Sequence, residues 1–155
     1  MKLNYSRDEQ LLKKILNTII NSTAGLKHVL VIDDSGVTIL SESKFHFADN
    51  EVAVEKIGAI GGAVFIAGEE QGIILGYGNI RIQITEYNNG MIFSAKIGNG
   101  VLCVATDINV QIGFIRAILK KWAPQITKVL NSYLKQDQSA TNQELKDLFS
   151  SDLTF

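Results

Sequence analysis

Apolar residues recur every three or four positions in three segments of the chain, at 6–24, 49–74 and 109–134. In the first segment the apolar set runs from Leu12 to Ile20. This spacing places apolar side chains together on one side of a helix. The pattern therefore predicts three helices, each of which covers another layer of the fold.

Between the predicted helices lie short runs that are rich in β-branched and aromatic residues. Turn residues at 34–36, 89–90 and 98–100 separate the runs within each group. This arrangement is typical of tight hairpins, so an antiparallel sheet is predicted, and the turns at 89–90 and 98–100 are expected to require a positive φ. The predicted strands occupy 27–33, 37–43, 79–87, 91–97 and 101–107.

The placing of apolar residues within each run predicts its position in the sheet. In the first run Val29 and Val31 alternate with Leu30, so both faces of that strand are expected to be covered. The run at 101–107 has the same character and is expected at the centre, whereas the half-polar run at 79–87 is expected at or near an edge. The elements predict an α/β fold, namely an α/β/α three-layer sandwich. Its five-stranded antiparallel sheet follows the order α-β-β-α-β-β-β-α plus a short C-terminal helix.

The last part of the chain changes in composition. Pro124 lies inside the third helical pattern and is expected to kink that helix near Lys120. The stretch after residue 134 is polar and is predicted to be a linker to a short amphipathic helix. The chain is thus divided into a domain at 1–134 and a linker with a helix at 135–155. The apolar side of the short helix consists of Leu145, Leu148 and Phe149.

Composition and charge narrow the classes of function. A chain of 155 residues has room for one domain with a sizeable core. Its net charge is −1 and its Lys and Arg residues are scattered, so nucleic acid is not expected as a partner. Cys103 is the single cysteine, and the charged N-terminal segment does not have the apolar character of a signal peptide. A cytoplasmic protein is therefore expected.

The second helical segment is rich in glycine, which suggests a membrane span, a phosphate-binding loop or contact with another helix. Its uncharged part, from Ile57 to Gly68, is shorter than the roughly 20 residues that a bilayer requires, so direct membrane insertion is not expected. A Walker loop needs a Gly-Lys pair, and the chain has none. No nucleotide cofactor is therefore expected, which leaves helix contact as the preferred interpretation.

Residues suited to catalysis or metal binding are few. The two histidines, His28 and His46, and Cys103 lie in unrelated segments without the spacing of metal ligands. The acid pairs at 33–34 and 69–70 are typical of solvated positions. We expect no metal, no cofactor and no catalytic residue, and hence a protein that is not an enzyme.

A helical wheel shows that the second helix is apolar on both sides. Ile60 and Val64 belong to the side that is expected to face the sheet, and Gly62 belongs to the opposite side. Small residues on that opposite side would let a second copy approach closely, with the edge strand pairing to its own copy. Gly62→Leu is then predicted to disrupt the dimer more than the fold. The alternative is that a loop or the tail of the same chain covers this side. The predicted dimer interface comprises Ala59, Gly62, Ala63, Ile66, Ile80, Arg81, Ile82, Gln83 and Ile84.

The order of elements, together with "GLKHVLVIDDSGVTILSES", "NGVLCVATD" and "VQIGFIRAILKKWAPQITKVL", resembles the Roadblock / dynein light chain family over roughly residues 8–134. The resemblance implies a homodimer with a continuous sheet through the third strand and paired central helices. It also implies a non-catalytic adaptor or regulator of a small Ras-like GTPase. The acidic helix ends and the tail are candidates for GTPase contact, although the tail could instead dock on its own chain. The candidate partner-binding residues are Glu51, Glu55, Glu69, Glu70, Leu145, Leu148 and Phe149.

Other functions stay open at the level of the sequence. A longin-like or profilin-like module for ligand sensing or for adaptor contacts would need an apolar pocket. A light-chain-type subunit of a larger complex would use similar surfaces. An enzyme would need His28 or His46 beside a nucleophile in a cleft.

Overall fold

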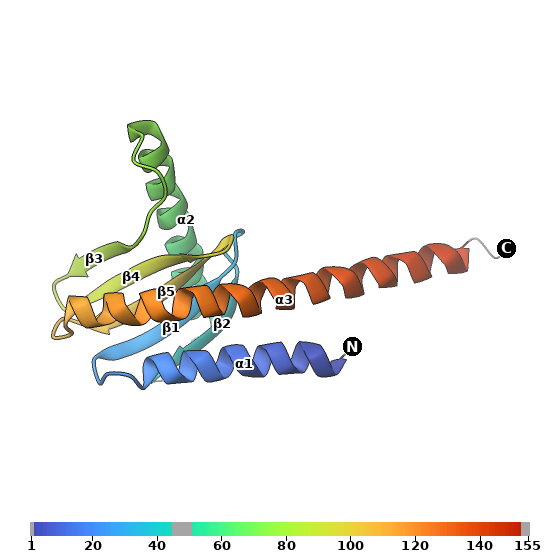
Figure 1. The fold of residues 1–155 in the computed structure, drawn as a ribbon, viewed down its shortest axis with the longest axis horizontal. Helices are drawn as coiled ribbons and strands as arrows, with labels where there is room; N and C mark the ends of the chain where they lie inside the picture. Colours follow the sequence, from blue (N-terminus) through green and yellow to red (C-terminus); the bar gives the residue numbers. More distant parts are fainter. Residues whose placement is uncertain (1, 45–50, 153–155) are drawn as a thin grey trace.

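The computed structural model describes residues 2–44 and 51–152, and the side chains within them except those of 2–6, 51–52, 134, 136–140 and 151–152. The order of its elements confirms the predicted α-β-β-α-β-β-β-α (Figure 1). The elements are α1 (Lys2–Ile20), β1 (Leu26–Ile32), β2 (Thr38–Ser43), α2 (Glu51–Leu75), β3 (Gln83–Tyr87), β4 (Gly90–Ile97), β5 (Gly100–Asp107) and α3 (Ile112–Asp152).

The strands form one antiparallel sheet in the order β2-β1-β5-β4-β3. The positions of β5 at the centre and β3 at an edge confirm the predictions. β3 is shorter than predicted, because its pairing with β4 begins at Gln83, opposite Ser94. Within the described part of the chain, residues 95–97 of β4 therefore have no strand on their outer side.

Helices cover both faces of the sheet, as the predicted three-layer sandwich requires. Figure 1 shows α1 and α3 side by side on one face and α2 on the other. The larger core lies between the sheet and the α1–α3 pair. Phe93, Leu102 and Ile115 are fully buried there. This core anchors the fold.

A smaller core lies between the sheet and α2. Phe65 is 2% exposed and packs in one cluster with Leu30 and Ile32 of β1. Val29 and Val31 belong to the larger core on the other face. β1 is therefore covered on both faces, as predicted from the apolar residues at both its odd and its even positions.

The glycines in the first half of α2 face the protein's own sheet and turn. A Cβ on Gly62 would lie 3.3 Å from the Cα of Gly36 in the β1–β2 turn. A Cβ on Gly58 would collide with the Thr38 hydroxyl. The prediction that Gly62 lies on the outward side of the helix is wrong. Its small size allows a hairpin of the same chain to approach.

The wheel was also wrong about two large residues. Ile60 is 63% exposed and Val64 is 48% exposed, although both were predicted to face the sheet. The prediction assumed that bulky apolar residues mark the side of α2 that faces the sheet. In the structure, most of that side is formed by glycines and by Phe65. The remaining residues of α2 that were predicted to face outward are exposed, and they are Ala59, Ala63 and Ile66.

The two glycine turns owe their glycines to different causes. Gly98, between β4 and β5, has a φ of 65°, which confirms the prediction of a positive φ. Gly90 has no positive φ, so that prediction is wrong for the β3–β4 turn. A Cβ on Gly90 would lie 2.6 Å from the carbonyl oxygen of Thr106 on β5. Close approach of the neighbouring strand therefore excludes a side chain there.

α3 is one continuous helix that runs through Pro124 to Asp152. The linker predicted after residue 134 is therefore wrong, and residues 144–149 are the last turns of α3 rather than a separate helix. The polar stretch contains neither glycine nor proline, so nothing in it terminates a helix. Figure 1 shows this end of α3 extending well beyond the sheet. The division of the chain at residue 134 stays a prediction.

By length and composition, Ala53–Leu75 of α2 is apolar enough to cross a membrane, with a mean hydropathy of 1.2. The argument from the shorter uncharged part therefore does not hold for the whole helix. A core helix of a soluble protein passes the same test, and α2 packs on the sheet through Phe65. Only 17% of the apolar stretch of this helix is buried, so most of it is not covered by the rest of the chain.

Candidate partner-binding surface

The outward side of α2 is a large exposed apolar surface. It is called the outer α2 face below. Ile73 is 70% exposed and Ile74 is 81% exposed, although they lie in the most apolar helix of the chain. Exposed apolar surface of this extent is typical of protein contacts. The outer α2 face consists of Ile60, Val64, Ile66, Ile73, Ile74 and Leu75.

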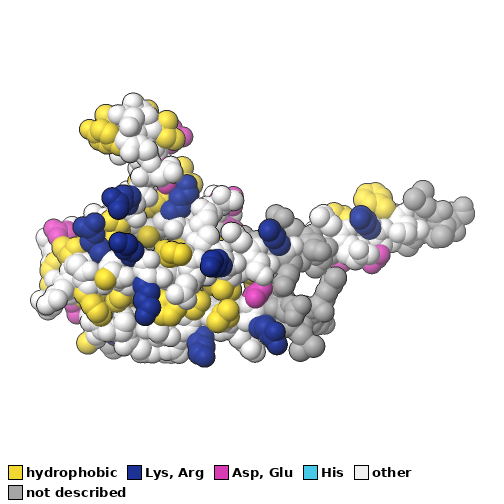
Figure 2. Space-filling view, in the orientation of Figure 1, with side chains coloured by type: hydrophobic (Ala, Val, Ile, Leu, Met, Phe, Trp, Pro, Cys, Tyr) yellow, Lys and Arg dark blue, Asp and Glu magenta, His cyan; other side chains and the backbone are white. Residues whose placement is uncertain are grey.

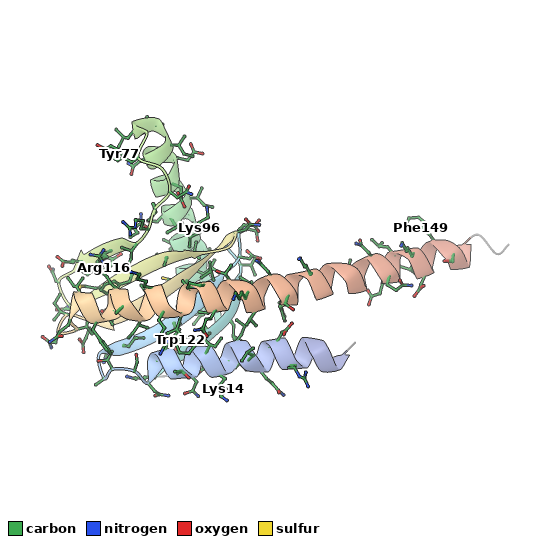
Figure 3. All side chains as sticks on the ribbon, in the orientation of Figure 1. Lys14, Tyr77, Lys96, Arg116, Trp122 and Phe149 are labelled. Atoms are coloured by element: carbon green, nitrogen blue, oxygen red, sulfur yellow. The ribbon has the colours of Figure 1, made fainter. Side chains whose placement is uncertain are left out.

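The C-terminal half of α2 stands beyond the body of the protein (Figure 1). Tyr77, just past its end, is 80% exposed and lies at the tip of this projection (Figure 3). The chain then returns alongside α2, and a Cβ on Gly72 would lie only 2.6 Å from the carbonyl oxygen of Gly78. Glycine at this position therefore lets the returning segment pack against the helix.

Glu69 connects the projecting half of α2 to the sheet. The backbone N–H of Ile80 donates a hydrogen bond to Glu69 Oε2 at 3.1 Å, and Lys96 Nζ lies 3.6 Å from Glu69 Oε1. The Glu69 side chain is 15% exposed. Glu69 therefore holds the segment that leads into β3, which is a different role from the predicted solvated position at a helix end.

An acidic groove of about 250 Å³ lies beside α2. Glu69 and Glu70 line it together with Asp33 and Asp34 from the β1–β2 turn, and the lining also includes Lys96, Ile66 and Ile73. The structure thus brings the two acid pairs of the sequence to one place. Glu55 is exposed near the start of α2, outside this groove, and the side chain of Glu51 lies outside the described residues.

Asp33 owes its place in this groove to the turn that it organises. Its Oδ1 accepts hydrogen bonds from Ser35 N at 2.9 Å, Ser35 Oγ at 2.6 Å and Val37 N at 2.9 Å. Burial alone would raise the pKa of Asp33, but the hydrogen bonds from Ser35, Val37 and Gly36 together lower it. Asp33 is therefore a structural carboxylate of the turn, and it is ionised at neutral pH.

β3 begins close to α2, because a Cβ on Gly68 would lie 2.8 Å from Gln83 Nε2. Gln83 and Ile84 lie in the strand itself, whereas residues 80–82 lie in the segment before it. The other side of β3 is paired with β4, so the outer edge presents backbone groups without a strand partner. All five residues predicted for a dimer contact through this strand are therefore at this edge or directly before it.

Comparison with known proteins groups the chain with archaeal relatives. It is 31% identical over 107 residues to the uncharacterized protein MJ0310 of Methanocaldococcus jannaschii, which covers 69% of this chain and 90% of MJ0310. MJ1340 of the same organism gives the same values. No protein-family model matches the chain. The chain belongs to the family of MJ0310 and MJ1340.

Solved structures identify the fold. An MglB structure with a tetrameric arrangement matches with a TM-score of 0.70 and 14% identity, covering 84% of this chain and 92% of that one. A Roadblock/LC7 domain from Streptomyces avermitilis matches with a TM-score of 0.66 and 13% identity, covering 79% and 96%. The chain has the Roadblock/LC7 fold. Profilin II of Acanthamoeba castellanii is more distant, with a TM-score of 0.52 and 13% identity, covering 74% of this chain and 95% of that one.

The Roadblock-type domain brings one histidine next to a hydroxyl group. His28 Nδ1 lies 2.8 Å from Ser43 Oγ across the β1–β2 pair. Neither residue lines the acidic groove. Burial, and then the charge of Lys27, lower the pKa of His28, so the ring is neutral at pH 7. His46 lies outside the described residues.

The remaining chemical groups of the Roadblock-type domain have structural surroundings. Cys103 is 1% exposed in the centre of the sheet, and burial raises the pKa of its thiol, opposed by a hydrogen bond from Ser94. A search of the described residues finds no cluster of His, Cys, Asp or Glu that could hold a metal ion. The most prominent exposed features of the domain are the outer α2 face, the acidic groove and the β3 edge.

Sequence reasoning missed two parts of this surface. The predicted helix ended at about Ile74 without a role for its last residues, although Ile73, Ile74 and Leu75 are among the most exposed apolar residues. Gly72 and Gly78 carried a signal, because close glycines beyond the sheet-covering part indicate a helix packed on a returning segment rather than on the core. The approach of the β1–β2 turn to the middle of α2, at Gly62, had no local signal.

Proposed function

We propose that this Roadblock-type domain is a homodimeric, non-catalytic scaffold that binds a small Ras-like GTPase and modulates its GTP hydrolysis. The single observation that carries the proposal is the outer α2 face beside a free β3 edge. Both features are unfavourable in an isolated monomer, and one contact between two copies would cover both.

The position of α2 supports a dimer through β3. α2 crosses the sheet over β2, β1 and β5, and its last turns pass beyond the β3–β4 side. If two copies paired β3 with β3, each projecting α2 would lie over the sheet of its partner. Full burial of a side chain such as Ile74 is worth about 1.5–3 kcal/mol. The outer α2 face thus supplies enough apolar surface for a stable dimer.

GTPase binding rests on the family resemblance and on the acidic groove. Glu70, Asp33 and Asp34 form a rim that is suited to basic side chains of a partner. In the proposed dimer, two such grooves flank the paired helices. The domain would contribute surface and orientation, with no catalytic group of its own, and it would act in the cytoplasm.

The similarity to profilin favours one alternative, a monomeric adaptor or ligand-sensing module of the same fold. This alternative leaves the outer α2 face to a different protein, as a light-chain-type subunit would. It predicts a monomer in solution, whereas our proposal predicts a dimer, so the oligomeric state separates the two.

Light scattering coupled to size-exclusion chromatography tests the dimer, and a monomer at micromolar concentration would contradict the proposal. Binding is then measured with a purified small Ras-like GTPase from the same genome, in its GDP-bound and GTP-analogue-bound states. Asp34→Lys, in the β1–β2 turn and off α2, should weaken the complex and leave the dimer intact. Glu42→Lys, in β2 at the opposite edge of the sheet from β3 and outside the groove, is the matched control. Equal binding by all variants would contradict a role for the acidic groove.

A further inference from the structure

A second groove, of about 430 Å³, lies on the other face of the molecule, between α3, the free edge of β4 and the segment before β3. It is called the basic groove below. Figure 2 shows Lys and Arg side chains gathered over this region, and Figure 3 labels Lys96 and Arg116 there. Ile82 and Leu119 add apolar lining. The cations that line the basic groove are Arg81, Lys96, Arg116 and Lys120.

Few acidic side chains of the protein neutralise the positive charge of these cations. Among the described residues, Arg81, Arg116 and Lys120 form no salt bridge, and Lys96 reaches only Glu69, at 3.6 Å. The stretch of α3 at 112–136 contains no acidic residue at all. Like charges that converge in one groove repel each other, and an anionic partner relieves that repulsion. The apolar lining indicates that the partner also carries apolar side chains.

The end of α3 has the complementary character. Leu145 is 47% exposed and Phe149 is 66% exposed. Spacings of three and four residues put them on one side of the helix, together with Leu148. Glu144 and Asp147 supply negative charge on the same turns. This amphipathic end, at residues 144–149, carries two acids and one base, Lys146, beside its apolar side, so its net charge is opposite to that of the basic groove.

The α3 end cannot enter the basic groove of its own chain. Pro124 already lines that groove, and α3 continues as one helix beyond it. At about 1.5 Å per residue, Leu145 lies roughly 30 Å farther along the helix axis. If an α3 end occupies the groove, it must therefore come from another molecule.

We propose that the α3 end of one copy docks in the basic groove of a second copy. The apolar side of the helix then lies on the apolar lining of the groove, and Glu144, at the flank of that side, lies beside Arg116 and Lys120. Asp147 lies about 150° from the apolar side and adds negative charge at longer range. Its α3 cations, Arg116 and Lys120, lie outside the residues of the proposed dimer contact, whereas the segment at 80–82 borders both surfaces. The docking would link dimers into larger assemblies. It needs no GTPase.

Cysteine crosslinking between chains is the direct test. Lys120→Cys and Phe149→Cys variants of the full chain are mixed and oxidised, and the native Cys103 contributes little background because it is 1% exposed. Crosslinked pairs should form in the mixture far more than in either variant alone. The matched control is Lys121→Cys mixed with Phe149→Cys, because Lys121 does not line the groove. Equal crosslinking of test and control mixtures would overturn the proposal.

Charge reversal provides a second, independent measurement. Arg116→Glu with Lys120→Glu should weaken association beyond the dimer on the order of tenfold, and so should Glu144→Lys with Asp147→Lys. Mixing the two double variants should restore it. Reversal of two α3 cations outside the groove, Lys121 and Lys128, is the control and should have little effect. Failure of the mixture to recover association would contradict the contact.

Other occupants predict different results. If the groove binds a free phosphate compound, inorganic phosphate should raise the Tm of the wild-type chain but not that of the Arg116→Glu, Lys120→Glu variant, and no crosslink should form. That result would overturn the proposal. Crosslinking that persists in an Ile74→Asp background, where the α2 contact is broken, would show that the two contacts are independent. The docking and the proposed dimer can therefore fail separately.

Discussion

The two faces of the sheet differ in how completely the chain covers them. On the α1–α3 face, a continuous core includes fully buried residues from both helices and from the sheet. On the α2 face, the core is a small cluster around Phe65, and much of the helix above it is exposed and apolar. The first face is complete within one chain. The second face is as apolar as a protein interior but has no covering layer from its own chain, which is why we propose that another molecule covers it.

The largest expected effect on stability comes from the complete face. Phe93→Ala removes a side chain that is 0% exposed, and it should lower the free energy of unfolding by about 3–5 kcal/mol. Urea denaturation measures the change. Phe65→Ala in the smaller core is the matched variant and should cost less, because fewer buried neighbours surround the cavity. Equal losses would mean that the two faces do not differ as described.

Ile74→Asp tests the incomplete face. Ile74 is 81% exposed, so the variant should leave the stability of the monomer unchanged. It should raise the dissociation constant of the dimer at least about tenfold, because an unpaired carboxylate would be buried in the contact. Analytical ultracentrifugation measures the dimer. Phe114→Asp, at an exposed apolar position on α3, serves as control; if it dissociates the dimer equally, the contact lies elsewhere.

Gly62→Leu separates the inward and outward sides of α2. The side chain would press on Gly36 and Ile32, so we expect a loss of about 1–3 kcal/mol in the free energy of unfolding. Ala63→Leu, one residue along and exposed, should keep the fold and affect only association. A stable Gly62→Leu protein with a broken dimer would instead support the outward position that the helical wheel predicted.

The smallest expected effect is a pH dependence at His28. Burial, followed by the charge of Lys27, lowers its pKa below the ordinary 6.5, so the folded state disfavours the proton. This residue's contribution is fully present above pH 6.5 and is lost as the pH falls through the window below that value. Thermal melts between pH 7 and pH 5 should show a small decline that His28→Gln reduces. An unchanged decline would assign the pH dependence to other groups.

The sequence predicted most of the fold, because local patterns carry it. Both parities of β1 are apolar, and the strand is buried on both faces; the pattern at 101–107 is equally apolar, and β5 is central. The candidate site was less predictable. From the sequence pattern alone, Gly62 is expected to contact a second helix. In the structure, the β1–β2 turn of the same chain contacts it instead. Periodicity defines the sides of a helix without stating which side meets the sheet.

The amino-acid sequence by itself determined the five strands, the three long helices and their order, the antiparallel hairpins, and the presence of an α2 that is too apolar for one covered side. Only the tertiary structure decided which side of α2 is covered, how far the helix projects past the sheet, and that α3 continues to Asp152. The physical reason is range. Strand alternation, turn residues and helix spacing act between near neighbours in the chain. The rotation of α2 and the meeting of distant charges in two grooves depend on packing between segments that the sequence does not place side by side.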